Sequence, residues 1–362
     1  MSKIRKPRPL LCFNELISLK NLYIAHKDSR KSKRHKFAVI DFEANLFSNL
    51  YVLHTKLFDQ TYKITKYKTF YVYEPKKREI QALGYKDRIV QHTLCDNFLI
   101  PYYEKRLVFS NCACRLNKGS LFARNLLKKY LIQFYQKHKQ NGFVLRCDIK
   151  KYFANIDHNV LKSQLEKLPD KKIQKLIFDI IDSYNFSTKK GLPIGNQVSQ
   201  IMGVVYMDKL DKYIKQTLKI KYYVRYMDDL VLIHHDKTYL QFCLQKMTDV
   251  LQSLRLEFNE KTQISPLKNG ISFLGGNFVC QNKKIIIKLK KQSKTRIIKN
   301  LKTLDYITKN NPNKQRYIQN SLAGISGHLN GFRCPLFIKK VDNFSKSRLF
   351  FTTKKQIGRA HV

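Results

Sequence analysis

The stretch KYYVRYMDDLVLIHH (Lys221 to His235) decides the fold of this chain. Its two apolar runs, VRYM and LVLI, flank a polar turn and predict a β-hairpin with Asp228 and Asp229 at the tip. An Asp-Asp pair at a turn is often only solvated turn chemistry. Here apolar strands bury the hairpin on both sides, so the two acids project from a rigid platform, where their mutual repulsion favours a nearby cation.

A second strand supplies a third carboxylate. FVLRCDI (Phe143 to Ile149) is a short apolar strand that ends in Asp148, and pairing beside the hairpin would place this acid next to Asp228. Oxygen ligands at two strand ends suit hard divalent cations such as Mg²⁺. We therefore predict a site for two Mg²⁺ ions, held by Asp148, Asp228 and Asp229 together with Ile149. Two such ions about 4 Å apart can activate a hydroxyl nucleophile and stabilise a leaving pyrophosphate.

The segments YMDD (Tyr226 to Asp229) and DIKKYF (Asp148 to Phe153) together resemble the palm of reverse transcriptases, and the likeness extends in order over most of the chain. The resemblance implies an α+β right-hand polymerase fold with fingers, a palm built on an antiparallel sheet, and a helical thumb. It implies RNA-directed DNA synthesis from dNTPs, with an RNA template, a DNA or RNA primer, and Mg²⁺, for which Mn²⁺ can substitute. It also places Phe153 where these enzymes hold a bulky side chain that clashes with a ribose 2′-hydroxyl. Plain core packing is the alternative for Phe153.

Further residues carry over from the family one position at a time. Lys77 and Arg78 resemble finger residues that bind the incoming triphosphate, and an arginine fork suits phosphate oxygens. Arg88 and Arg115 are similar candidates for nucleotide or template, and Lys261 resembles the lysine that protonates the leaving pyrophosphate. Ordinary solvated surface charge is the alternative for each of them. The segment FLGG, which comprises Phe273, Leu274, Gly275 and Gly276, resembles the primer grip, where glycines let two backbones approach closely.

The loop GLPIGNQVSQ (Gly191 to Gln200) discriminates among subfamilies. Intron-encoded and retron enzymes usually read PQG at its start and end it in Ser-Pro, whereas Ile194 precedes Gly195 here and Gln200 follows Ser199. This pattern resembles the reverse transcriptases of diversity-generating retroelements and poorly classified bacterial relatives. Gly195 and Gln200 are therefore assigned to the nucleotide site. Because an apolar Ile194 replaces a hydrogen-bonding glutamine under the templating base pair, the resemblance implies error-prone copying, particularly opposite template adenines.

The resemblance implies a chain of four parts, namely a basic N-terminal arm over 1–37, fingers over 38–142, a palm over 143–282 that carries a finger-like insert near 160–190, and a basic helical thumb over 283–355. Residues 1–37 carry eleven Lys or Arg and read either as a poorly ordered solvated arm or as an RNA-binding one. Apolar spacing predicts a single helix over 38–61, a strand-turn-strand over 68–80 and a strand over 271–278. The last seven residues, 356–362, back-translate to a common sequencing-adapter read, so we expect them to be foreign to the natural protein.

The charge of the chain points to a polyanionic partner. Seventy Lys plus Arg against 26 Asp plus Glu give a formal net charge of +44, and nucleic acid is the commonest partner for such a field. No apolar run approaches the ~20 residues of a membrane-spanning helix, and the eight scattered cysteines form no CxxC repeat. From these features we expect a cytoplasmic protein that binds a structured RNA, and the resemblance implies that it is bacterial or phage-encoded. A mutagenic retroelement enzyme would also be expected to work with a small basic accessory protein.

Three other functions remain open at this stage. A group II intron-like or phage-defence reverse transcriptase would copy RNA without a mutagenic role. An RNA-dependent RNA polymerase usually has a smaller or polar group where Phe153 stands, which disfavours it. A catalytically idle RNA-binding scaffold could use the same basic fold, although Asp148, Asp228 and Asp229 are all intact.

Overall fold

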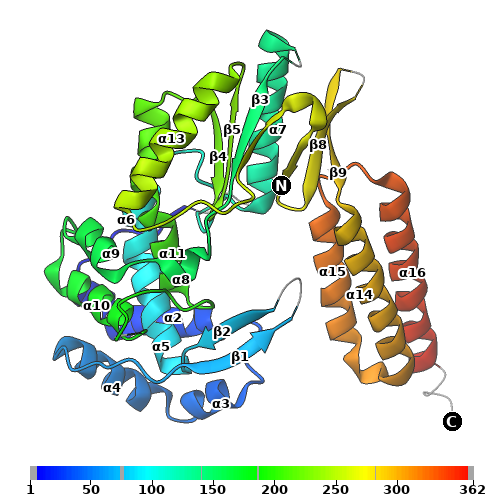
Figure 1. Cartoon of the computed structure of the whole chain (residues 1–362). Coiled ribbons are helices and arrows are strands. Elements are labelled where there is room, and N and C mark those ends of the chain that lie inside the picture. Colours follow the sequence, from blue (N-terminus) through cyan, green and yellow to red (C-terminus); the bar gives the residue numbers. More distant parts are fainter. Residues whose placement is uncertain (1–5, 74–76, 140, 186, 282, 358–362) are drawn as a thin grey trace. The chain divides into compact units, whose positions relative to one another are not determined.

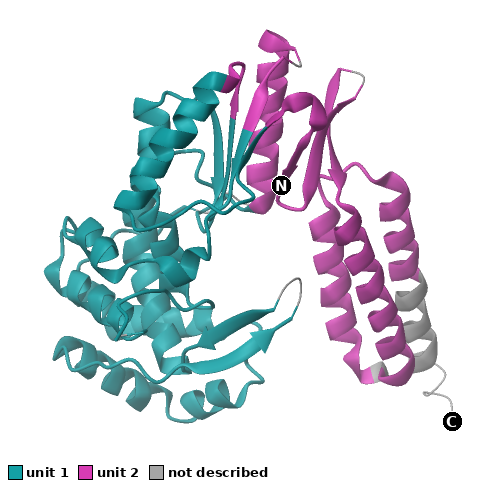
Figure 2. Cartoon of the chain, in the orientation of Figure 1, with its two compact units in different colours: residues 1–119, 145–232, 238–264 teal, residues 120–144, 233–237, 265–362 magenta. Residues whose placement is uncertain are grey.

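The computed structural model of this chain describes residues 6–73, 77–139, 141–185, 187–281 and 283–357. The chain forms two compact units, each built from segments that are distant in sequence (Figure 2). Residues 1–119, 145–232 and 238–264 belong to the first unit, and residues 120–144, 233–237 and 265–362 to the second. Helices and strands occur in both units, so the expected α+β class is confirmed (Figure 1).

The first unit is mostly helical outside its sheet strands. Its α-helices are α1 (Phe13–Leu16), α2 (Leu19–Ser29), α3 (Phe37–Ala44), α4 (Leu46–Phe58), α5 (Tyr85–Leu94), α6 (Ile100–Glu104), α8 (Tyr152–Asn155), α9 (His158–Leu165), α10 (Lys171–Asp182), α11 (Gln197–Tyr206), α12 (Asp208–Lys212) and α13 (Lys237–Ser253). α5 runs through a π-helical turn, Cys95–Leu99, into α6, and a second π-helical turn, Tyr213–Thr217, follows α12. α10 begins where Asp170 accepts hydrogen bonds from the backbone N–H groups of Lys172 and Ile173, which satisfies the free donors of its first turn.

A four-stranded sheet carries the predicted hairpin. Its strands lie in the order β4-β5-β3-β6, with β4 at Tyr222–Tyr226, β5 at Asp229–His234, β3 at Phe143–Cys147 and β6 at Gln263–Pro266. β4 and β5 are almost wholly buried, as their apolar sequences predict. β3 lies directly beside β5, so the strand that ends before Asp148 neighbours the hairpin, as expected.

A separate two-stranded ribbon lies in the first unit. β1 (Lys68–Val72) pairs antiparallel with β2 (Arg78–Ala82), and Val72 is opposite Arg78. This confirms the predicted strand-turn-strand. The turn itself falls on residues 74–76, which lie outside the described part of the chain.

The second unit combines a helix, a small sheet and a helical bundle. α7 (Ser120–His138) contacts β9, the edge strand of an antiparallel sheet of order β7-β8-β9. These strands are β7 (Ile271–Phe273), β8 (Gly276–Gln281) and β9 (Lys284–Leu289). Three helices then pack against one another, namely α14 (Lys291–Asn310), α15 (Gln315–Leu329) and α16 (Pro335–Ile357). In the described residues, each helix is too short or too polar to cross a lipid bilayer.

Three local predictions were wrong. The helix predicted over 38–61 is two helices, because Asn45 takes a non-helical conformation (φ −125°, ψ 48°) between α3 and α4. The strand predicted over 271–278 is a hairpin. The segment after Lys283, predicted to be helical throughout, begins with the strand β9. Of the two alternatives for the region 1–37, the poorly ordered arm does not hold where α1 and α2 form and bury Leu16 and Leu22 completely, and RNA binding by this region stays a prediction.

The predicted adapter-derived segment, 356–362, lies almost wholly outside the described residues. Only Gln356 and Ile357, the last residues of α16, are described.

Candidate active site

The β4–β5 turn places a carboxylate on a strained backbone. Met227 and Asp228 form the whole connection between the two strands, and Met227 has the left-handed φ of +55°. A residue without special turn chemistry adopts this conformation only where its surroundings enforce it. Asp228 is half-buried, whereas Asp229 is exposed and begins β5. The two adjacent acids therefore lie in different environments.

Asp148 and Asp228 interact through their charges. Burial raises the pKa of Asp228 above its ordinary value, and the neighbouring carboxylate of Asp148 raises it further. The cations Arg78 and Arg225 act in the opposite direction and favour the ionised carboxylate. A divalent cation would stabilise the ionised form of Asp228 beside the neighbouring carboxylate of Asp148. Asp148 and Asp228 thus fit the predicted metal site.

The third predicted carboxylate, Asp229, does not form a three-residue metal-binding group with Asp148 and Asp228. Across the described ranges, no group of three or more His, Cys, Asp or Glu side chains is arranged to hold a metal ion. The structure therefore brings together Asp148 and Asp228 and leaves Asp229 on the exposed side of the turn.

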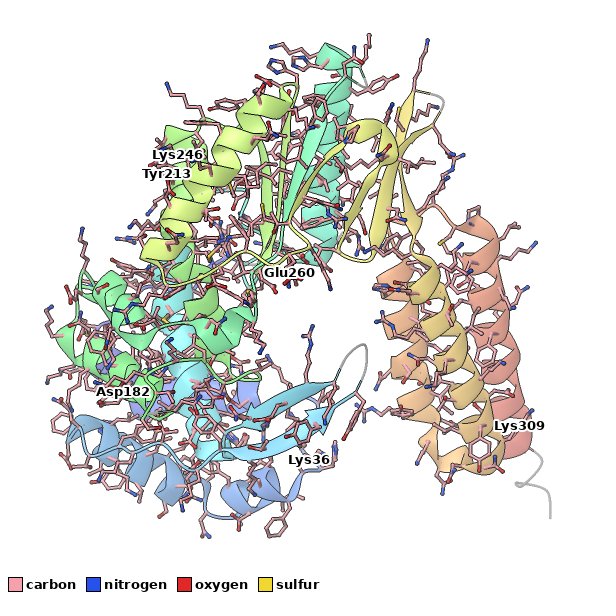
Figure 3. The ribbon with its side chains drawn as sticks, in the orientation of Figure 1. Lys36, Asp182, Tyr213, Lys246, Glu260 and Lys309 are labelled. Atoms are coloured by element: carbon pink, nitrogen blue, oxygen red, sulfur yellow. The ribbon has the colours of Figure 1, made fainter. Side chains whose placement is uncertain are left out.

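A short segment after α13 holds Asp148 in place. The Asp148 carbonyl accepts a hydrogen bond from the backbone N–H of Asn259 at 2.7 Å, and its own N–H donates to the Thr262 hydroxyl at 3.4 Å. Lys261 lies in this segment beside Glu260, which Figure 3 labels. The Lys261 side chain is exposed, and its backbone N–H donates to the Asn259 side chain at 3.1 Å. Lys261 thus lies between the two residues, Asn259 and Thr262, that form hydrogen bonds with the Asp148 backbone.

The arginines and lysine of the predicted triphosphate site have different positions. Arg78 is exposed at the start of β2, and its charge opposes the rise that burial causes in the pKa of Asp228, so it lies within electrostatic reach of that carboxylate. Lys77 is exposed, and its Nζ lies 4.8 Å from the centroid of the Tyr71 ring. Arg88 is half-buried on α5, donates from Nε to the Leu83 carbonyl at 3.1 Å, and lowers the pKa of Lys33. Of these three, Arg78 is the one that the structure links to Asp228.

Arg115 is already occupied by protein groups. Its side chain is only 5% exposed and donates to the Val108 carbonyl at 2.6 Å and to the Glu104 carboxylate at 2.9 Å. Further bonds run to the Glu104, Leu107 and Asn111 carbonyls. All three guanidinium nitrogens are engaged, so Arg115 holds the 104–111 segment together. We therefore do not retain it as a nucleotide ligand.

Phe153 packs against a glycine of α11. It is half-buried, and a Cβ built on Gly203 would lie 3.1 Å from its ring. The preceding Tyr152 donates its hydroxyl to the Gly203 carbonyl, and the two rings meet edge to face. Close contact with α11 therefore holds the Phe153 ring, which lies five residues after Asp148 in the sequence.

The loop at 191–200, which discriminates among subfamilies, forms hydrogen bonds with β2. The sequence did not predict this contact. The Gln81 backbone donates to the Ile194 carbonyl at 3.1 Å, and the Asn196 side chain donates to the Gln81 carbonyl at 3.1 Å. Gly195, between them, has φ +117°, and a Cβ there would lie 2.9 Å from the Ile80 side chain, so a glycine is required. The loop is therefore hydrogen-bonded to the same strand that begins with Arg78.

The start of α11 is held by a buried glutamine of α5. Gln91, 4% exposed, accepts hydrogen bonds through Oε1 from the N–H groups of Gln197 and Val198 at 3.0 and 3.4 Å. Gln200, one turn later, is exposed and lies 3.6 Å from the Cys114 sulfur. Sequence reasoning missed Gln91, although its position after the apolar pair Ile89-Val90 was a usable signal.

The FLGG segment forms a tight hairpin in the second unit. Phe273 pairs with Gly276, and the two residues between them have φ +43° (Leu274) and +78° (Gly275), the combination of a type I′ turn. A Cβ at Gly276 would lie 2.7 Å from Ile287 of β9. The close neighbour of the Gly276 backbone is thus a side chain, and the role of this segment as a primer grip stays a prediction.

The hairpin with Asp228 in its turn, the neighbouring strand followed by Asp148, and the ribbon that carries Arg78 are the arrangement expected of a nucleotide polymerase. Residues 76–278, more than half of the chain, match the family model described as reverse transcriptase (RNA-dependent DNA polymerase). The chain belongs to the reverse transcriptase family. The solved structure of apo telomerase from Candida tropicalis has the same fold, with a TM-score of 0.52 at 15% identity over 81% of this chain and 59% of that one.

Two curated proteins are similar in part. The COX1/OXI3 intron 2 protein of Saccharomyces cerevisiae is 28% identical over 138 residues, which are 36% of this chain. This chain spans only 15% of the length of that yeast protein. The ribonuclease P protein component of Petrotoga mobilis is 29% identical over 82 residues, which are 20% of this chain and 70% of that protein.

Proposed function

We propose that this protein is an RNA-directed DNA polymerase that extends a primer on an RNA template by two-metal nucleotidyl transfer. The observation that carries the proposal is that Asp148 and Arg78, from two other elements, both act on the charge of Asp228 in the β4–β5 turn, in a chain of the reverse transcriptase family. Primer-extension assays with RNA and DNA templates test it directly. Absence of dNTP incorporation with both Mg²⁺ and Mn²⁺ would refute it.

Each part of the site has a stated role in this proposal. Asp148, Asp228 and the Ile149 backbone would hold two Mg²⁺ ions, with Asp229 as a further ligand. When bound, these ions supply activation of the primer 3′-hydroxyl and neutralise charge on the pyrophosphate. Arg78 would bind the triphosphate, assisted by Lys77, because guanidinium and ammonium groups match phosphate oxygens. Lys261 would protonate the departing pyrophosphate.

Phe153 would exclude ribonucleotides. Replacing Phe153 with alanine should increase incorporation of rNTP relative to dNTP by about 10²-fold, because pocket size alone discriminates substrates to this extent. The measurement is the ratio of kcat/KM values for dGTP and GTP in single-nucleotide extension.

Gly203→Ala is the matched control for the gate. The added Cβ would press on the Phe153 ring at 3.1 Å, so this variant should not gain rNTP use. If Phe153→Ala keeps the wild-type ratio, Phe153 is a packing residue and not a gate.

The loop at Ile194 would lower fidelity, as in diversity-generating retroelements. Its support is the sequence IGNQVSQ and the fixed contact of this loop with β2. Replacing Ile194 with glutamine should reduce misincorporation opposite template adenines by about tenfold, the effect of one net hydrogen bond of about 1 to 1.5 kcal/mol. Deep sequencing of cDNA made on a defined RNA measures this. Uniformly accurate copying by the wild type would instead favour a group II intron-like or phage-defence role.

The partners in this proposal are a structured RNA and a small basic accessory protein. The net charge of +44 supports strong, salt-dependent binding to RNA phosphates. Genes flanking the natural locus would reveal both the template repeat and the accessory protein.

A second candidate function is RNA binding without catalysis. The partial similarity to a ribonuclease P protein component and the excess of cations favour it. The two functions separate in cells: a variant with Asp228 replaced by alanine would lose function if polymerisation matters and keep it if the protein is a scaffold.

A further inference from the structure

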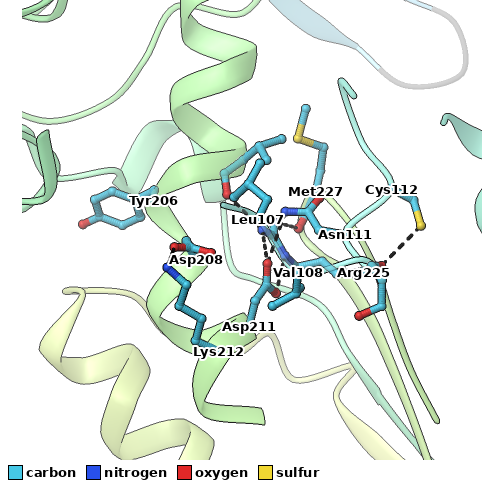
Figure 4. Close-up of polar contacts among 12 residues, drawn as sticks. Leu107, Val108, Asn111, Cys112, Tyr206, Asp208, Asp211, Lys212, Arg225 and Met227 are labelled. Atoms are coloured by element: carbon cyan, nitrogen blue, oxygen red, sulfur yellow. Dashed lines mark hydrogen bonds and ion pairs between the residues drawn. The ribbon is translucent and has the colours of Figure 1, made fainter. Parts of the chain in front are cut away.

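A buried ion pair lies directly under the turn that carries Asp228. The Arg225 guanidinium, on β4, forms a two-pronged contact with the Asp211 carboxylate, with Nε–Oδ1 and Nη2–Oδ2 distances of 2.7 Å each (Figure 4). Both side chains are 0% exposed. This geometry fixes the plane of the guanidinium, because both ends of the fork are held at once.

The remaining donors of Arg225 reach two backbone carbonyls. Nη2 also donates to Val204 of α11 at 2.9 Å, and Nη1 donates to Met227 at 3.0 Å. Met227 is the residue with φ +55° in the turn, and its carbonyl belongs to the peptide that leads into Asp228. The guanidinium therefore holds the strained peptide immediately before the carboxylate.

Asp211 is in turn fixed from other elements. Its Oδ1 accepts the Tyr223 hydroxyl at 2.5 Å, and its Oδ2 accepts the Asn111 amide at 3.2 Å. The Arg225 backbone pairs with the 110–112 segment, donating to Ser110 at 3.0 Å and accepting from Cys112 at 2.9 Å. Figure 4 shows Asp211 of α12, Arg225 of β4 and Asn111 of the 107–112 segment converging. Three separate segments thus determine where one guanidinium lies.

We infer that Arg225 is a positioning residue, which sets the Met227–Asp228 peptide so that the Asp228 carboxylate takes a single orientation toward Asp148. A buried ion pair is weak evidence for stability, since apolar residues of similar volume often replace one without loss. Apolar residues could fill this space but could not hold the Met227 carbonyl. The inference rests on the proposed polymerase function, because it is Asp228's catalytic geometry that the network controls.

The decisive variant removes the polar network while keeping the core filled. It combines Asp211→Leu, Tyr223→Phe and Arg225→Met, which conserve volume approximately and leave no charge unpaired. We expect a folded protein with a melting temperature near that of the wild type. Its kcat should fall by about 10²-fold with dNTP KM unchanged, because misplacing a reacting group by about 1 Å has this effect. Binding of Mn²⁺, followed by electron paramagnetic resonance without RNA or dNTP, should weaken by about tenfold.

Two single variants complete the design. Tyr223→Phe is the matched control, because the tyrosine hydroxyl contacts Asp211 and the phenylalanine leaves the Arg225–Met227 bond in place. It should keep most of the wild-type kcat and Mn²⁺ affinity. Arg225→Lys retains a charge opposite Asp211 but lacks the guanidinium fork. It should therefore show the losses of kcat and Mn²⁺ affinity expected for the triple variant, and it tests the inference independently if the triple variant does not fold.

The outcomes separate the inference from the proposed function. A folded triple variant or Arg225→Lys protein with wild-type kcat and Mn²⁺ affinity overturns the positioning role. So does a Tyr223→Phe protein that loses as much of both as the other variants. If the wild type copies no RNA, the proposed function fails, and the Mn²⁺ measurement alone still decides whether Arg225 orients Asp228.

Discussion

Replacing Asp228 with asparagine should abolish DNA synthesis and, in the presence of a chelator, raise the melting temperature of the protein. The loss of rate should be about 10³-fold or more, because removing one ligand from a metal site withdraws several kcal/mol of transition-state stabilisation. The gain in stability follows from the pKa of Asp228, which burial and Asp148 hold above its ordinary value. An asparagine cannot ionise and so avoids the repulsion.

The pH dependence of stability sets the direction of the expected difference between the variant and the wild type. Because the folded-state pKa of Asp228 is raised, the folded protein binds a proton more tightly than the unfolded chain. The stabilising contribution is fully present below the ordinary carboxyl pKa and is lost as pH rises through the raised value. The variant should therefore be more stable than wild type at neutral pH and equal to it in acid. Thermal unfolding across pH with EDTA measures the difference.

Asp229→Asn is the matched control for Asp228. Asp229 is exposed at the start of β5, so its replacement should change stability little and reduce the rate of synthesis less. Equal losses of rate in both variants would show that the two acids contribute equally to metal binding, contrary to their different burial.

Replacing Asp211 with alanine should destabilise the protein by about 3 to 5 kcal/mol. The change leaves the Arg225 guanidinium buried without its counter-charge, and an uncompensated buried charge has an effect of this size. It also removes the acceptor for the Tyr223 hydroxyl. Urea denaturation followed by circular dichroism gives the free energy of unfolding.

The control for Asp211 is an ion pair at the surface. Asp249 lies 3.8 Å from Lys246, which Figure 3 labels on α13, and both side chains are substantially exposed. Asp249→Ala should therefore cost less than about 1 kcal/mol. A similar loss in the two variants would mean that the Asp211 environment is more hydrated than its burial implies.

The active-site hairpin could be predicted from sequence because its signals are local. The apolar runs around Asp228 and the acid that ends β3 are visible within short windows, and both predictions hold in the structure. The prediction that β3 pairs beside the hairpin also holds, because β3 lies next to β5 in the sheet.

Other features depend on contacts that a short window does not contain. Arg115 and Arg78 are both arginines in polar segments. Only the fold reveals that carbonyls of residues 104–111 surround Arg115. Asp211 and Arg225 are 14 residues apart on different elements, so neither sequence position predicts the other. The run KKIIIKLK suits a strand or a buried helix face equally well, which explains why β9 was missed.

The backbone bonds between Gln81 and the loop at Ile194 limit how an enzyme of this kind can evolve. The strand that presents Arg78 at one end is joined near its other end to the loop at Ile194, which we propose lies beneath the templating base pair. A mutation that displaces the loop therefore also displaces the arginine-bearing strand. Copying accuracy and nucleotide affinity should consequently change together, and lineages that alter one would need compensating substitutions along β2 to restore the other.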